Sequence, residues 1–448
     1  MDLLIKGGKV VFGDVIREVD IGVENGKIVG FYTATHSPEA DEVVDAGGLI
    51  VLPGAIDVHP HIYDPELMGD RDDYDYATGA GAIGGLTSIV EMPTSTPCLS
   101  VERIKLKIEH GEEKCYVDFG LHGGNVRTID DFKEIDELIK LGVISYKVFT
   151  CEPYTTDDYA IFTLMSKLKG IGVVMAHSEN EGIIRGETEK LKSMGRKDPR
   201  AHHEGRPMVA EEEAITKLSI FAHRSGGSIH IVHMTSKFGV EAVRRGKLEG
   251  IDITAETCPH YLVFSIDDVD RLGPYLKTNP PFRDKESVVA LWGGLRDGTV
   301  DMVTSEHFPT FKSQREVGWE DIWKVPSGLP GIETFFTIVF SEGYNKGRLS
   351  LFDLKKVLSI NPAKRFGLHP RKGDLLIGAD ADIILVDPDE EWTIKAEKLH
   401  MRSDWSPFEG LKVKGRVKRT IIRGTTVFDG ENLCVKPGFG EYIPRKLR

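Results

Sequence analysis

The residues with the clearest chemical potential are two histidines in the segment PGAIDVHPH, His59 and His61. Residues i and i+2 of a β-strand project from the same face, so both imidazoles would point the same way. Two further histidines, His177 in VVMAHSEN and His233 in IHIVHMTS, each close an apolar run that predicts a strand. Glu306 closes another such run in VTSEHFP. Imidazole and carboxylate ligands suit Zn²⁺ or another first-row divalent ion, so the pattern predicts a metal centre.

Lys147 is unusual because it lies within the apolar run ISYKVFT. A buried ammonium is costly, so such a lysine must reach solvent, pair with an acid or lose its charge. One interpretation is a lysine that extends to the edge of the fold and pairs with a carboxylate. The other is a neutral amine that reacts with CO₂ to give a carbamate, an anionic ligand able to bridge two metal ions. The residues alone leave both interpretations open.

Two other patterns favour structural roles. His230 lies three residues before His233 and would face the opposite side of its strand, which is typical of a packed histidine. The glycines of GAGAIG at 79–84 match a dinucleotide-binding pattern, but that pattern needs a strand directly before it. Here the charged segment DRDDYDYAT precedes the glycines, so we expect close-packed positions in a helix.

The elements that position the candidate ligands follow from the alternation of short apolar runs with charged helical segments, which is typical of a parallel sheet. Eight such runs close a (β/α)8 barrel, and residues 55–307 suit one barrel of about 250 residues. The carboxyl ends of barrel strands meet at the mouth where active sites lie. A doubly wound sheet is the alternative. The predicted strands are 55–61, 87–92, 116–122, 144–150, 172–179, 228–235, 251–258 and 300–307.

The two ends of the chain have a different sequence pattern from the middle. The first fifty residues and the last eighty alternate apolar and polar residues and are broken by Gly-Gly and Asn-Gly, which predicts antiparallel hairpins. We therefore predict an α/β protein in which residues 51–369 form a (β/α)8 TIM-like barrel. Residues 1–50 together with 370–448 would form a small β-sandwich domain beside it.

The composition of the chain excludes several classes of binding partner and of metal site. Lys and Arg number 57 against 70 Asp and Glu, a net charge of -13 that argues against nucleic acid or an anionic membrane surface. No apolar run approaches the roughly 20 residues of a membrane helix. The first residues, MDLLIKGGKVVFGD, do not resemble a signal peptide, so we expect a cytoplasmic protein. The five cysteines form no C-x-x-C pair, so any metal must be held by histidines and carboxylates.

The whole chain resembles the cyclic-amide hydrolases of the amidohydrolase superfamily: dihydropyrimidinase or hydantoinase, allantoinase and dihydroorotase. The resemblance implies a (β/α)8 barrel, a β-sandwich built from both termini, and ring opening by a metal-bridging hydroxide. The motifs run in family order from about residue 48 to 387. They are PGAIDVHPH, GGLTSIVEMP, YKVF, AHSEN, IVHMTS, AETCPHYL, KTNPPFR, SEH-x-P, SGLPGIET, NPAKRFGL and KGDLLIGADADIILVDP.

The resemblance also implies roles for the candidate residues. Two divalent ions, expected to be zinc, would be bridged by carboxylated Lys147. Glu306 would act as an acidic ligand and as the base that moves a proton from the hydroxide to the ring nitrogen. The ligands of the two ions would be His59 and His61 for one, and His177 and His233 for the other.

Three positions depart from the family pattern. The acidic ligand is normally Asp, and Glu306 adds a methylene. Dihydroorotases carry Arg where this chain has Tyr63, which cannot clamp a carboxylate in the same bidentate way. Hydantoinases usually have Tyr where this chain has Glu152, with Tyr154 two residues further on.

These departures leave the substrate open among small cyclic amides and imides. Asn279 in KTNPPFR, the backbone around Ser327 and Gly328, and Tyr63 are the expected substrate contacts. A neutral hydantoin, dihydropyrimidine or allantoin-like ring is the expected substrate, and dihydroorotate is the alternative. Another alternative is a non-catalytic relative of dihydropyrimidinase. The resemblance further implies a homodimer or homotetramer.

Overall fold

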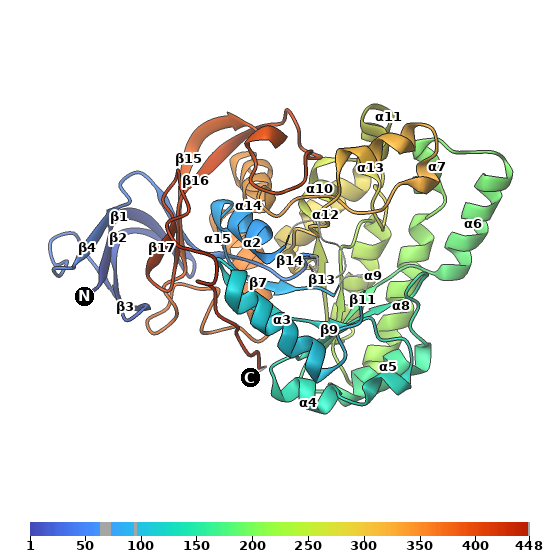
Figure 1. Cartoon of the computed structure of the whole chain (residues 1–448), viewed down its shortest axis with the longest axis horizontal. Helices are drawn as coiled ribbons and strands as arrows, with labels where there is room; N and C mark the ends of the chain where they lie inside the picture. The colour runs from blue at the N-terminus through green and yellow to red at the C-terminus, as the bar shows by residue number, and fades with distance from the viewer. Residues whose placement is uncertain (63–72, 94–95, 447–448) are drawn as a thin grey trace.

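The eight predicted barrel strands are present and run parallel (Figure 1). The computed structural model describes residues 1–62, 73–93 and 96–446. Strands β8 and β9 follow each other in the chain and together supply the third position of the ring. The strands are β6 (Ala55–Asp57), β7 (Leu86–Glu91), β8 (Asp118–Leu121), β9 (Gly123–Gly124), β10 (Ser145–Phe149), β11 (Val173–His177), β12 (Ile229–Ile231), β13 (Ile253–Thr257) and β14 (Met302–Val303).

The ring closes between its first and last strands. Beyond β6, the N–H of His61 donates to the carbonyl of His307 at 2.8 Å. The N–H of Ser305, just after β14, donates to the carboxylate of Asp57 at 3.1 Å. An open doubly wound sheet would leave these two strands apart, so that alternative is wrong.

The interior of the barrel is filled by alternate residues of its strands. Val90 and Met92, and likewise Val173 and Met175, are i,i+2 pairs that belong to one buried cluster. Phe366 and other side chains from the last part of the chain join the same cluster. The remaining members are Ile56, Val58, Val232, Met302, Ala363, Leu368 and Ile443.

The helices surround the strands and begin at defined caps. The side chains of Ser100, Asn180, Ser236 and Asp284 each accept from the backbone N–H three residues later, which satisfies a free helix-end donor. The longer helices are α2 (Tyr74–Ile83), α3 (Val101–Lys114), α5 (Asp158–Lys167), α6 (Glu181–Ser193), α8 (Met208–Ser225), α9 (Lys237–Leu248) and α12 (Lys285–Asp297). The shorter ones are α4 (Ile135–Lys140), α7 (Pro199–Glu204), α10 (Pro259–Val263), α11 (Val269–Leu272), α13 (Lys312–Glu316), α14 (Phe335–Val339), α15 (Leu351–Lys355) and α16 (Asn361–Arg365).

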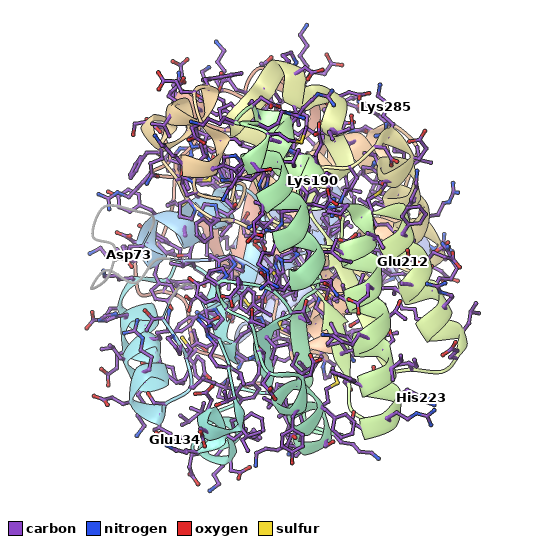
Figure 2. The ribbon with its side chains drawn as sticks, turned by 90° about the vertical axis from the view of Figure 1, so that its right-hand side faces the viewer. Asp73, Glu134, Lys190, Glu212, His223 and Lys285 are labelled. Atoms are coloured by element: carbon purple, nitrogen blue, oxygen red, sulfur yellow. The ribbon has the colours of Figure 1, made fainter. Side chains whose placement is uncertain are left out.

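The outer faces of these helices carry charged side chains. Figure 2 shows Lys190 on α6 and Glu212 on α8 projecting away from the barrel. Gly79 and Gly81 are buried within α2, directly before β7, so the prediction of close-packed helical glycines is confirmed. Within the described ranges, no helix combines the length and apolar character needed to cross a bilayer.

The two ends of the chain form one sheet, as Figure 1 shows in blue and red. Its order is β17-β16-β15-β5-β1-β2-β3, with β4 paired to β1, and its inward side chains form a core of their own. Asn25 and Gly26 turn the β2–β3 hairpin with positive φ, as an Asn-Gly turn requires. The strands are β1 (Leu3–Phe12), β2 (Val15–Glu24), β3 (Lys27–Tyr32), β4 (Glu42–Asp45), β5 (Ile50–Pro53), β15 (Ile383–Thr393), β16 (Lys412–Ile422) and β17 (Thr425–Phe428).

A buried ion cluster joins this sheet to the barrel. Lys372 Nζ lies 2.6 Å from Asp382, 3.0 Å from Asp380 and within ion-pair distance of Asp118 at the start of β8. The three carboxylates lie close enough to hold a cation, but the lysine already supplies the positive charge there. The sequence division into 1–50 with 370–448 and 51–369 stays a prediction, and β5 crosses its first boundary.

Candidate active site

A cavity of about 540 Å³ opens at the carboxyl ends of the barrel strands. The structure brings nearly all of the predicted site residues to it. Its base carries His61, Lys147, His177, His233 and Glu306, and its wall carries Asn279, Ser327 and Gly328. His59 is fully buried and contacts Glu306 and Lys147. Tyr63 lies outside the described residues.

The first histidine pair gathers around Glu306. Nε2 of His59 lies 2.8 Å from one carboxylate oxygen of Glu306, and Nε2 of His61 lies 3.8 Å from the other. Lys147 Nζ lies 3.3 Å from Nε2 of His59. The predicted strand 55–61 ends earlier, at Asp57, because that carboxylate accepts from the N–H of His59 and because Pro60 has no N–H to donate. Both rings nevertheless face the same acid.

The second pair consists of His177 at the end of β11 and His233 just beyond β12. Nδ1 of His177 faces Nε2 of His233 at 3.0 Å, and both rings are buried. Two ring nitrogens directed at one point is the arrangement that a shared cation requires. The site therefore contains two pairs of imidazoles, with Lys147 between them in the barrel.

Two residues of the site have strained backbones. His233 has φ of 39° and Glu306 has φ of 48°, a left-handed conformation that is uncommon for residues other than glycine. Such a conformation costs on the order of 1–3 kcal/mol and persists where surrounding contacts hold it. Both residues lie beyond the observed ends of their strands, because β12 ends at Ile231 and β14 at Val303, before the predicted ends at 235 and 307.

Electrostatics favour neutral imidazoles at His61, His177 and His233 and an ionised Glu306. At His59 burial acts to lower the pKa, but the neighbouring Glu306 and Glu256 raise it. Burial lowers the pKa of His61 to about 3 and that of His233 well below its ordinary value. Burial acts to raise the pKa of Glu306, but the neighbouring histidines and Lys147 bring it down to about 2. Burial also lowers the pKa of Lys147 to about 8, so its neutral amine becomes accessible near neutral pH. Neutral imidazoles and carboxylates are the forms that bind metal ions.

These donors fit a divalent cation. Ligand atoms of His59, His233 and Glu306 all lie within 4.8 Å of one another. A buried cluster of imidazole nitrogens with one carboxylate, next to a lysine amine, is a nitrogen and oxygen donor set of the type that zinc prefers.

Two further carboxylates support the histidines and carry no prediction from the sequence. Glu256 on β13 contacts Nδ1 of His59, and its other oxygen lies 3.0 Å from Nε2 of His230. Glu179 lies 2.8 Å from Nε2 of His177. His230 is a packed histidine, as predicted, but the prediction that it faces away from the site is wrong. It packs against Phe366 in the barrel interior and contacts Glu256, the acid that holds His59. The available signal was an acid within AHSEN and another within AETCPHYL.

The cavity wall offers polar groups to a small ring. Oδ1 of Asn279 is buried and has no hydrogen-bond partner among the described residues. The N–H of Gly328 already donates to the carbonyl of Lys277 at 3.2 Å, which leaves Ser327 and the Gly328 carbonyl for contacts. Only glycine fits at 328, because φ is 117° and a Cβ would lie 2.5 Å from the ring of Phe308.

The third departure from the family pattern also lies at the cavity. Glu152 and Tyr154 both line it. The ring of Tyr154 lies 5.2 Å from the guanidinium of Arg127 and 5.2 Å from the ring of Phe149, so it is held against its neighbours.

A closed (β/α)8 barrel with histidines, a lysine and a carboxylate at its strand ends defines the class of metal-dependent barrel hydrolases. The sequence model of the Amidohydrolase family matches residues 50–427, and the chain belongs to that family. The resemblance inferred from the sequence motifs and the predicted fold class are therefore confirmed.

Individual relatives span the whole chain. The chain is 33% identical to an L-hydantoinase of Paenarthrobacter aurescens over 452 residues, covering 99% of this chain and 98% of that protein. It is 36% identical to an allantoinase of Deinococcus radiodurans over 455 residues, covering 100% of both. A solved structure of the L-hydantoinase (dihydropyrimidinase) from Arthrobacter aurescens matches with a TM-score of 0.94 at 33% identity, covering 100% of both chains.

Proposed function

We propose that this protein is a metal-dependent cyclic amidohydrolase that opens the ring of a neutral hydantoin, dihydropyrimidine or allantoin-like substrate. The observation that carries the proposal is the contact between buried Lys147 and His59 beside Glu306, at the base of a cavity of about 540 Å³. The names of its relatives, hydantoinase and allantoinase, agree with a cyclic amide as substrate.

The same residues would hold two divalent ions, with zinc as the proposed metal. The ions would supply Lewis acidity, which lowers the pKa of a water molecule and polarises a carbonyl group. The neutral amine of Lys147 would attack CO₂, form an N–C bond and release its proton, giving a carbamate. His59 and His61 would ligate one ion, His177 and His233 the other, and the carbamate would bridge them.

The side chains around the metals would handle proton and substrate. Glu306, at the base of the cavity, would accept the proton of the attacking water and deliver it to the departing ring nitrogen. Oδ1 of Asn279, which needs a donor, would accept from an N–H of the ring. Ser327, the carbonyl of Gly328 and Tyr63 would complete the substrate contacts. The product would be a ring-opened ureido acid or a similar compound.

Dihydroorotate is the second candidate because Arg206 lines the same cavity and a guanidinium can bind a carboxylate. The charge of Arg206 is, however, already paired with Glu179. Loss of a charge-assisted contact costs on the order of 1.5–3 kcal/mol, or about tenfold to a hundredfold in specificity. A homodimer or homotetramer and a cytoplasmic location stay predictions.

The test is a substrate panel with purified protein. We expect kcat/KM for dihydrouracil, hydantoin or allantoin to exceed that for dihydroorotate at one pH, and elemental analysis to give about two divalent ions per chain. A clear preference for dihydroorotate would reverse the order of the two candidates. Protein that takes up no divalent ion, even on reconstitution, would overturn the binuclear proposal.

A further inference from the structure

Glu179 is a fully buried acid that contacts a candidate metal ligand. One carboxylate oxygen lies 2.8 Å from Nε2 of His177. Both oxygens accept from Nε of Arg206 at 3.2 Å, and Nη2 of the same arginine also donates to the carboxylate. The backbone of Glu179 is held as well, because its N–H and its carbonyl both bond the hydroxyl of Thr150 at 2.9 Å. The acid is therefore fixed in place by side-chain and backbone contacts.

This arrangement determines which nitrogen of His177 carries the proton. A carboxylate only accepts, so Nε2 must donate to Glu179 and Nδ1 keeps its lone pair. Nδ1 is the atom that faces Nε2 of His233 at 3.0 Å. Nδ1 of His233 has no hydrogen-bond partner among the described residues, so Glu179 is the orienting acid of this pair.

The first pair of histidines repeats the same arrangement. Glu256 is also fully buried, contacts Nδ1 of His59 and is itself held by His230 at 3.0 Å. Nδ1 of His61 has no hydrogen-bond partner in the part of the chain that the structure describes. Each pair thus contains one histidine whose ring is oriented by an acid and one whose Nδ1 has no such partner. Glu256 also accepts from the backbone N–H of His233 at 3.3 Å, a contact that does not orient the ring.

We infer that Glu179 and Arg206 form a positioning pair that orients His177 toward the metal position shared with His233. Glu256, held by His230, positions His59 for the other metal. Carboxylates that orient metal-binding histidines typically change metal affinity by about 10–100-fold when they are removed. The inference rests on the proposed binuclear site. Since Arg206 also lines the cavity, the pair connects the cavity wall, where substrate would bind, to the candidate metal ligands at the cavity base.

The experiment measures zinc at each position separately. Zinc-loaded crystals of wild type, Glu179→Gln and Glu256→Gln are compared by anomalous diffraction, and zinc affinities are measured with a competing chelator. We expect Glu179→Gln to lose occupancy at the His177–His233 position, and to bind one of its two ions about 10–100-fold more weakly. Glu256→Gln should instead lose zinc occupancy at the His59–His61 position and keep it at the His177–His233 position. Activity is not needed for either measurement.

The control is Glu91→Gln, which changes a buried acid whose side chain contacts Lys107 at 2.6 Å and Tyr74 at 2.9 Å instead of a candidate metal ligand. It should keep both zinc ions. Since Glu179→Gln leaves a buried guanidinium unpaired, the double variant Glu179→Gln/Arg206→Gln avoids that charge if the single variant does not fold.

Two outcomes separate this inference from the proposal on which it rests. Wild-type crystals without two ions would overturn the binuclear proposal, and the inference with it. Two ions in wild type, together with unchanged occupancy, affinity and His177 ring orientation in the Glu179 variants, would overturn the inference alone. An equal loss at both positions would also overturn it, because general loosening of the barrel predicts that result.

Discussion

Lys147 Nζ and His59 Nε2 lie 3.3 Å apart, although β10 and β6 are not neighbours in the barrel. On one side of the ring β7, β8 and β9 separate the two strands, and on the other side β11 to β14 do. The two side chains meet across the barrel mouth, where Glu306 also reaches His59. Ring closure and assembly of the ligand set are therefore a single structural requirement.

Replacement of Lys147 tests the carbamate directly. Lys147→Ala removes the proposed bridge, so two positive ions would lie close together with less neutralisation. We expect metal content to fall below two ions per chain, and kcat to fall roughly 10²–10³-fold, as when one electrostatic stabiliser is removed. A small added carboxylate such as propionate should restore part of both. Elemental analysis and rate measurements with and without propionate check this.

The matched control is Lys107→Ala, because Lys107 is also a buried lysine in an ion pair but lies away from the cavity. Its rate per folded molecule should not respond to propionate. Normal metal content and rate in Lys147→Ala would show that the lysine serves a purely structural pairing.

Replacement of Glu306 tests the effect of a glutamate where the family usually has an aspartate. Glu306→Asp shortens the side chain by one methylene and moves the carboxylate away from His59, now 2.8 Å distant. A misplacement of about 1 Å can cost about 10²-fold in rate, so we expect kcat to fall by that order. The amide of Glu306→Gln cannot accept a proton, so kcat of this variant should fall by about 10²–10⁴-fold. Steady-state kinetics at saturating metal measure both.

Stability should not follow activity at this position. Aspartate adopts the left-handed backbone of residue 306 more readily than glutamate does. Glu306→Asp should therefore keep or slightly raise the free energy of unfolding, measured with urea. If Glu306→Gln retained the wild-type kcat, the base would have to be another residue.

The sequence predicted the barrel and the histidines that gather at its mouth because both depend on local patterns. Apolar runs of strand length, separated by charged helical segments, are visible without tertiary information. Once the runs are placed in a barrel, a polar residue at a carboxyl end must face the mouth, as His177 does at the end of β11. Lys147 lies in the middle of β10 and not at its carboxyl end, so only the family resemblance placed it beside the histidines.

The supporting acids could not be predicted in this way. Glu179 follows His177 by two residues and looks like any polar residue of a loop, and its contact with Arg206 depends on how a distant segment folds back. Glu256 reaches His59 only because β13 and β6 face the same interior after closure. The left-handed backbone at Glu306 is likewise imposed by surrounding contacts and leaves no mark in the sequence.

The ion cluster between the terminal sheet and the barrel should be essential for stability. Lys372 is 1% exposed and lies among the carboxylates of Asp118, Asp380 and Asp382. Lys372→Met would remove the buried cation that contacts all three carboxylates and leave Asp382 without an ion-pair partner among the described residues. Asp118 would keep Arg423, and Asp380 would keep Arg371. Removal of one partner of a buried pair costs roughly 3–5 kcal/mol. Lys27 contacts Asp380 from a half-exposed position, so Lys27→Met should cost only about 1 kcal/mol or less. Equal decreases in the free energy of unfolding of the two variants, measured with urea, would contradict this ranking.

His400 should make a pH-dependent contribution to stability. Its Nδ1 lies 2.9 Å from the carboxylate of Glu333, and its backbone N–H donates to the same carboxylate at 2.6 Å. The hydrogen bond to Glu333 raises the pKa of His400, although partial burial opposes the shift. A folded-state pKa above the unfolded value means that the stabilisation is fully present below the unfolded pKa of about 6.5 and is lost as pH rises through the folded pKa. The ring is half exposed, so the contribution should stay below about 1 kcal/mol.

We therefore expect His400→Gln to lower Tm relative to wild type at pH 5.5 and to match wild type at pH 9. A difference in Tm that stays constant across this range would show that the imidazole contributes through packing and not through its charge.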